Sequence, residues 1–129
     1  MNSMALCEYI ITYFYGVGHG MGKQTNQLLF EKQAEIAKAI GHPLRVAIVD
    51  FLRDGEQCVC DIADHVGSER SNISRHLSVM VKAGVLECRK EGLKVIYNLK
   101  TPCILDFLSC TSLVLKQQAT ESEKLLQSL

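Results

Sequence analysis

The fold of this chain is decided by residues 56–100, EQCVCDIADHVGSERSNISRHLSVMVKAGVLECRKEGLKVIYNLK. Two short helical patterns lie in its first half, at 61–66 and 71–83, and a glycine closes each of them, Gly67 and Gly84. Two helices joined through a tight glycine turn are typical of a helix-turn-helix. We therefore expect the second of these helices to be a recognition helix.

The second half of the stretch predicts a β-hairpin. Residues 85–89 and 94–99 are rich in β-branched and aromatic side chains, and Gly92 lies in the connection between them. Such runs around a glycine-containing turn are typical of two antiparallel strands. A helix-turn-helix followed directly by a hairpin is the arrangement of a winged helix.

Further helices are predicted on both sides of this region. Apolar residues recur at three- and four-residue spacing over 26–41, and Pro43 then begins a second, almost wholly apolar helix. Thr101 and Pro102 predict the start of a last amphipathic helix that runs towards Gln118. That helix finds no further partner in the sequence, so we expect its apolar face to contact another subunit.

The predicted fold class is mainly α with a β-hairpin, a dimeric winged helix-turn-helix. A chain of 129 residues is long enough to bury one real core but too short for two. Within that length we expect an N-terminal arm at 1–25, a DNA-binding and dimerisation domain at 26–120, and a C-terminal tail at 121–129.

The composition is that of a globular protein, and we expect it to be cytoplasmic. Apolar residues make up 47% of the chain and charged residues 22%. No apolar run reaches the roughly 18 residues that a membrane-spanning helix needs, and the apolar stretch 4–17 lacks the basic leader of a signal peptide. Six cysteines without an export signal indicate a reducing compartment, where paired thiols are more often ligands or redox switches than disulfides.

The distribution of charge indicates a nucleic-acid partner, although the net charge of the whole chain is zero. Residues 68–100 hold seven Lys or Arg against three Glu, a local charge of +4. Such a basic region is the electrostatic footprint of a DNA-binding face. The expected partner is double-stranded operator DNA with an inverted repeat, bound by a homodimer.

The residues expected to contact this DNA lie at the start of the recognition helix and on the hairpin. The first residues of a recognition helix enter the major groove, where asparagine suits adenine and arginine suits guanine. Cations on the hairpin suit the minor groove or the phosphate backbone. The alternative is a polar face that is merely solvated. The predicted contacts are Arg70, Ser71, Asn72, Ser74, Arg75 and His76 on the helix and Arg89, Lys90 and Lys94 on the hairpin.

A second candidate site is the thiol pair Cys58 and Cys60, which opens the first helix of the helix-turn-helix. Thiolates are the ligands preferred by trivalent arsenic or antimony, lead, cadmium and, less selectively, zinc. Two thiols cannot saturate such an ion, so a third ligand must come from elsewhere. Cys88 is not a candidate, because a cysteine in an apolar strand is expected to be a small core residue.

Enzymatic patterns are missing from the sequence. The chain has no glycine-rich phosphate loop and no His-Glu-x-x-His string. The combination of a thiol pair and a DNA-reading helix predicts a sensor and repressor, not an enzyme.

The order and spacing of four strings resemble the ArsR/SmtB family of metal-responsive repressors. These are EQCVCDIA at 56–63, NISRHL at 72–77, KAGVL at 82–86 and RKEGLKVIY at 89–97. The resemblance covers about residues 33–115. It implies a homodimeric winged helix whose first and last helices form the dimer interface. It also implies a repressor that leaves its operator when an effector binds, and arsenite or antimonite is the expected effector.

The resemblance also suggests where the third ligand lies. Arsenic-responsive relatives carry a motif similar to Cys-Val-Cys-Asp-Leu-Cys, whose third thiol corresponds to Ala63 here. Relatives similar to CadC complete the pair from an N-terminal arm, which makes Cys7 a candidate and cadmium, lead or zinc an alternative effector. Cys103 and Cys110, predicted on the last helix, are either ligands or packing residues of the dimer interface.

A thiol-redox sensor is a further alternative. Some repressors of this fold respond to persulfides or oxidants by linking a cysteine of an early helix to one of the last helix. Cys60 with Cys103 or Cys110 is the pair that would do this here. A low thiol pKa at a helix N-terminus would favour metal binding and redox chemistry alike, so both remain open.

Overall fold

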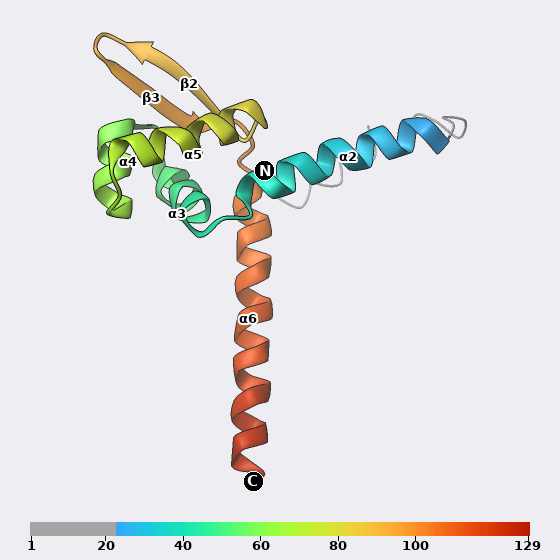
Figure 1. Cartoon of the computed structure of the whole chain (residues 1–129). Helices are drawn as coiled ribbons and strands as arrows, with labels where there is room; N and C mark the ends of the chain where they lie inside the picture. The colour runs from blue at the N-terminus through green and yellow to red at the C-terminus, as the bar shows by residue number, and fades with distance from the viewer. Residues whose placement is uncertain (1–22) are drawn as a thin grey trace.

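The structure is a computed structural model that describes residues 23–129, and it confirms the predicted fold class of helices with one small antiparallel hairpin (Figure 1). A short 3₁₀ turn, Leu52–Asp54, directly follows the second helix described. The elements in chain order are α2 (Lys23–Ile40), α3 (Pro43–Phe51), β1 (Gln57–Cys58), α4 (Val59–Val66), α5 (Arg70–Lys82), β2 (Leu86–Glu91), β3 (Lys94–Leu99) and α6 (Ile104–Gln127).

The helix-turn-helix consists of α4 and α5. Gly67 ends α4 with a φ of 65°, a left-handed conformation that glycine adopts without strain. Its N–H and that of Ser68 both donate to the carbonyl of Ala63, which satisfies the end of α4. The turn is therefore short and closed, and it fixes where α5 begins.

The hairpin predicted from the sequence belongs to a three-stranded antiparallel sheet in the order β1-β3-β2. β2 and β3 pair from Leu86 with Leu99 to Glu91 with Lys94. The two-residue strand β1, which was not predicted, pairs with the other edge of β3, so that Cys58 lies opposite Ile96. The segment that precedes α4 is thus hydrogen-bonded to the hairpin, which we call the wing.

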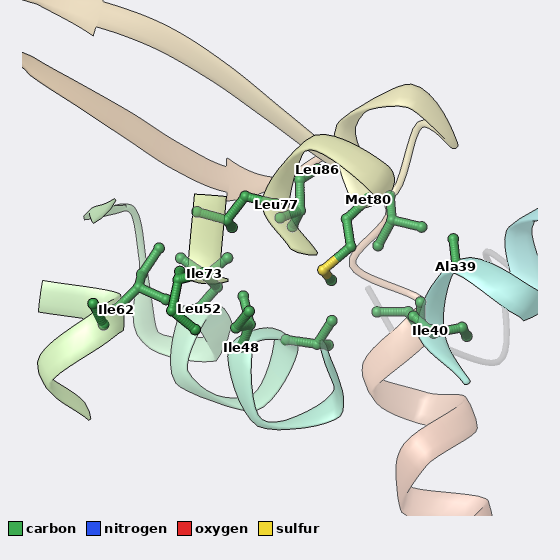
Figure 2. Packing of buried hydrophobic residues seen from close by; sticks show 13 residues of the cluster. Ala39, Ile40, Ile48, Leu52, Ile62, Ile73, Leu77, Met80 and Leu86 are labelled. Atoms are coloured by element: carbon green, nitrogen blue, oxygen red, sulfur yellow. The ribbon is translucent and has the colours of Figure 1, made fainter. Parts of the chain in front are cut away.

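The core lies between α3, α4, α5 and the base of the wing (Figure 2). Burial of one side chain of the size of valine, leucine or isoleucine contributes about 1.5–3 kcal/mol to the stability of the fold. α5 supplies three of these side chains from one face, which fixes that face inward and leaves the opposite face to solvent. The largest fully buried side chains are Ile48, Val49, Ile62, Ile73, Leu77, Met80, Val85 and Leu86.

The helices α2 and α6 project away from this core (Figure 1). Among residues 26–129, whose burial the structure describes, only Ala39 and Ile40 of α2 and Ile104 of α6 are buried on these two helices. Most of the large exposed apolar side chains lie on these two helices, so much of their apolar surface has no partner within one chain. The exposed residues are Leu28, Phe30 and Ile36 on α2 and Phe107, Leu113, Val114, Leu115, Leu125 and Leu126 on α6.

The boundaries of the outer helices differ from the predicted ones. α6 continues to Gln127 rather than ending near Gln118, so residues 121–127 belong to this helix. α2 begins at Lys23, three residues before its predicted start. The division into arm, domain and tail remains a prediction. Across residues 23–129, no helix is long and apolar enough to cross a membrane.

Candidate DNA interface and thiol site

The predicted DNA-reading residues are mostly exposed on α5. Arg70, Ser71, Ser74 and Arg75 lie on the solvent side, opposite the buried face. In the part of the chain that the structure describes, the side chains of Arg70 and Arg75 make no hydrogen bond or ion pair, so both guanidinium groups are available to an external partner. The N-terminus of this 13-residue helix adds a partial positive charge that favours phosphate.

Asn72 is already engaged in the turn that starts α5. Its Nδ2 donates to Ser68 Oγ at 2.9 Å, and the residue is half-buried. A bidentate contact with adenine needs both ends of the amide. The bond to Ser68 uses one of the two amide hydrogens, so the other hydrogen and Oδ1 are still available for such a contact, in an orientation that the turn fixes.

His76 packs against α3 rather than lying with Arg70 and Arg75 on the exposed face. Its Nδ1 accepts a hydrogen bond from Arg45 Nε at 3.2 Å, and its ring centroid lies 4.5 Å from that of His42. Burial lowers the pKa of His76, and the nearby His42 and Arg45 lower it further. The neutral form is favoured, and only Nε2 remains for any contact with DNA.

On the wing, the structure separates the three predicted cations. Lys90 and Lys94 are exposed, on either side of the turn at Gly92, which has a φ of 61°. Arg89 instead makes a two-pronged ion pair with Glu56, in which Nη2 donates to Oε1 at 2.6 Å. That bond is the main cause of a lowered pKa for Glu56. Arg89 therefore joins the wing to the segment before β1.

The thiol of Cys58 is built into the fold. The side chain is 4% exposed, and its Sγ accepts a hydrogen bond from the Asp61 N–H at 3.4 Å, which caps the N-terminus of α4. The Sγ also donates to Asp61 Oδ2 at 3.0 Å. That bond to a carboxylate is the largest cause of a raised Cys58 pKa. The thiol is therefore buried and used as a cap in this structure, and its part as a metal ligand stays a prediction.

The remaining cysteines are spread over the chain. Cys60 is half-buried in the first turn of α4, whereas Cys110 on α6 and Cys103, the residue just before α6, are exposed. Cys7 lies outside the described residues. Within residues 23–129, no three His, Cys, Asp or Glu side chains come together as a metal site. Cys58 and Cys60 thus offer at most two ligands of such a site.

Cys88 corrects a prediction. It is exposed on β2, opposite Tyr97 on β3, and is not a core residue. An apolar run does not reveal which of its positions faces outward when only Leu86, at the base of β2, is buried.

Three residues that shape these sites were not singled out from the sequence. Glu56 holds Arg89, Asp61 holds the Cys58 thiol, and Arg45 holds His76. Asp61 could have been found, because an acidic residue in the first turn of a helix is a common partner of its cap. The other two contacts join residues 33 and 31 positions apart and have no local signal.

Comparison with known proteins places these features in a family. Residues 42–87 match the family described as bacterial regulatory protein, arsR family. The chain is 45% identical over 64 residues to an uncharacterised helix-turn-helix-type transcriptional regulator of Methanocaldococcus jannaschii, which covers 49% of this chain and 72% of that protein. It is 30% identical over 80 residues to an arsenical resistance operon repressor of Staphylococcus xylosus, which covers 62% of this chain and 76% of that repressor.

The fold is also similar to a solved structure. The solution structure of a homodimeric winged helix-turn-helix DNA-binding domain from Mycobacterium bovis, a possible ArsR-family regulator, superposes with a TM-score of 0.66. The alignment covers 81% of this chain and 95% of that domain at 24% identity. At that identity the likeness supports the fold, the winged helix-turn-helix.

Proposed function

Because this chain belongs to the arsR family of bacterial regulatory proteins, we propose that it is a repressor that leaves its operator when a thiophilic ion binds Cys58 and Cys60. The family and the fold are those of DNA-binding transcription regulators and not of enzymes. Arsenite or antimonite is the proposed effector. The similarity to an arsenical resistance operon repressor supports this choice, as does the preference of trivalent arsenic for thiolates.

The DNA contacts that we propose follow from exposure. Arg70, Ser71, Ser74 and Arg75 enter the major groove, and Lys90 and Lys94 on the wing contact the phosphate backbone or the minor groove. The free guanidinium groups of Arg70 and Arg75 support this assignment. Asn72, His76 and Arg89 are held by contacts within the chain, so we assign them a secondary part.

The proposed effector step is an exchange of partners at Cys58. To bind an ion as a thiolate, Cys58 must release its proton to solvent and give up its hydrogen bonds with Asp61. α4 then loses its cap, and β1, to which Cys58 belongs, is pulled from its place. The single observation that carries this proposal is the double role of Cys58. Its Sγ caps α4, and its backbone pairs with β3.

Two connections would carry this change to the DNA-binding surface. β1 is hydrogen-bonded to β3, and the Glu56–Arg89 ion pair fastens the residue before β1 to β2. A displacement of Cys58 therefore moves the wing directly. The recognition helix α5 follows α4 after a closed turn, so a change at the start of α4 reaches it as well. A coupling of about 1.4 kcal/mol already changes operator affinity tenfold.

A homodimer would supply a partner for the exposed apolar faces of α2 and α6. We propose that α2 and α6 form the interface of a homodimer, since they carry most of the exposed apolar side chains. The third ligand would then be Cys103 or Cys110, from either subunit, or Cys7. Cadmium or lead bound through Cys7, or a redox link between Cys60 and Cys103 or Cys110, would use the same fold.

A fluorescence-anisotropy titration tests these proposals. Reduced protein is titrated onto an inverted-repeat operator alone and then with arsenite, antimonite, cadmium, lead, zinc or a persulfide donor. Release by arsenite or antimonite, lost in a Cys58→Ser/Cys60→Ser variant that still binds the operator, would support the proposed function. Release by cadmium or lead would favour the site with Cys7, and release by the persulfide donor alone would replace the metal proposal with the redox one.

A further inference from the structure

A cluster of basic side chains joins the recognition helix to the corner between α2 and α3. Arg45, near the start of α3, donates from Nε to His76 Nδ1 on α5 at 3.2 Å. Its Nη1 donates to the carbonyls of Lys38 and Ala39, the last turn of α2, at 3.3 Å each. One guanidinium group therefore holds three helices together, including the recognition helix.

His42 completes the cluster from the α2–α3 turn. Its Nδ1 accepts from the Leu44 N–H at 3.2 Å, which caps α3, and its ring lies tilted against that of His76 with centroids 4.5 Å apart. Both imidazoles thus use Nδ1 as an acceptor. A neutral imidazole with an accepting Nδ1 carries its proton on Nε2, so neither ring offers a lone pair to a metal ion in this arrangement.

The hydrogen bond between Arg45 and His76 exists only while His76 is neutral. An imidazolium has two N–H donors and no acceptor, so a protonated His76 would direct an N–H at the Arg45 guanidinium. The groups that act electrostatically on His76 are His42 from the α2–α3 turn and Arg45 from α3, both of which oppose a positive charge there. Across residues 23–129, no carboxylate of α2, α4, α5 or the wing contributes to the His76 environment.

We propose that His76, Arg45 and His42 form a proton-sensitive joint, in which protonation of His76 releases the recognition helix from the α2–α3 corner and lowers operator affinity. The proton comes from solvent. The direction of the pKa shift agrees with this geometry, since burial and the two basic neighbours favour neutral His76. The proposal rests on DNA binding by α5 and is independent of the thiol effector.

The sign of the pH dependence separates this joint from a direct DNA contact. If His76 touched phosphate, its protonation would add a positive charge at the DNA and raise affinity on acidification. A joint predicts the opposite. Uptake of one proton coupled to release changes affinity by at most about tenfold per pH unit.

The experiment measures operator affinity by anisotropy at constant ionic strength between pH 7.5 and pH 5.5. His76→Gln is the test variant, because its side-chain amide offers an acceptor oxygen but does not titrate. We expect the wild-type protein to lose affinity several-fold more than this variant on acidification. His65→Gln is the control, since His65 stacks on Phe51 with ring centroids 3.9 Å apart, outside the cluster, and it should keep the wild-type pH profile.

A second readout needs no DNA. Urea unfolding of the wild type and His76→Gln across the same pH range should show the wild type losing stability relative to the variant below its unfolded-state pKa of about 6.5. Equal pH profiles of the two proteins in both measurements, or a gain of wild-type affinity at low pH, would overturn the joint. Failure of the wild-type protein to bind any operator at pH 7.5 would instead contradict the proposed function. The unfolding measurement would then still test whether His76 and Arg45 form the joint.

Discussion

Replacing Cys58 separates its structural part from its part in sensing. Its Sγ caps α4 through the Asp61 N–H and also donates to the Asp61 carboxylate. Cys58→Ser keeps a hydroxyl that both accepts and donates, so the cap persists. Cys58→Ala removes it. Loss of a side-chain N-cap costs about 1 kcal/mol, and Cys58 is only 4% exposed, so its truncation also removes buried contacts of the sulfur.

The size of the effect is therefore measurable. We expect the free energy of unfolding of Cys58→Ala to be about 1–2 kcal/mol lower than that of Cys58→Ser, because the alanine variant loses the cap and the serine variant keeps it. For a domain of this size, 1 kcal/mol corresponds to roughly 4 °C in Tm. Urea denaturation and thermal melting of the two variants under reducing conditions give the difference directly.

The same pair of variants then tests sensing. Cys58→Ser should bind the operator like the wild type and stay bound in arsenite or antimonite, because the serine hydroxyl is a poor ligand for soft ions. Equal stability of the serine and alanine variants would refute the cap. Release of the operator from Cys58→Ser by arsenite would refute Cys58 as a ligand, whatever its effect on stability.

Three further outcomes are expected. Asp61→Asn, made in a Cys60→Ser background, should speed alkylation of Cys58 by iodoacetamide near pH 8, because the carboxylate that raises the Cys58 pKa is gone; an unchanged rate would contradict that cause. Glu56→Gln should keep effector binding but shrink the ratio of operator affinities without and with effector, which anisotropy measures, and an unchanged ratio would argue against coupling through the wing. Leu77→Ala should lower the free energy of unfolding in urea by about 2–5 kcal/mol, because Leu77 is 0% exposed. A decrease below about 1 kcal/mol would mean that neighbouring side chains fill the space that the leucine leaves.

The course of the backbone could be predicted because its signals are local. Pro43 starts α3 and Gly67 ends α4 as expected, since each fixes the backbone within a few residues. The two-residue strand β1 could not be predicted in the same way. It exists only because β3 lies beside it, and no periodicity can appear in two residues.

The properties of the candidate sites likewise divide into those with a local sequence signal and those that depend on tertiary contacts. The exposure of Arg70 and Arg75 follows from helical periodicity, because buried Ile73 and Leu77 fix which side of α5 faces inward. The engagement of His76 with Arg45 could not be predicted, since it depends on how α3 crosses α5. Residues of suitable chemistry were identified from the sequence, but which of them the fold already uses is a tertiary property.

Sequence patterns also describe the thiol pair incompletely. The spacing of Cys58 and Cys60 indicates a soft-ion site but does not reveal that the first thiol is a helix cap. A cap position accepts a polar side chain readily, and a cysteine there is chemically ambiguous between structure and sensing. The hydrogen bonds with Asp61 make the resting, protonated state part of the folded domain.

The helix α6 is long enough to convert a small rotation at one end into a large displacement at the other. Its 24 residues span about 36 Å at 1.5 Å per residue, and only its first residue is buried in the core. If such a rod is anchored at its free part, a tilt of about 5° at the domain end displaces the winged domain by roughly 3 Å over that length. Two half-sites on DNA lie about 34 Å apart, so the recognition helices of the two subunits must keep their separation within narrow limits. A small rearrangement where α6 meets the domain is therefore magnified into a mismatch with the helical repeat of DNA.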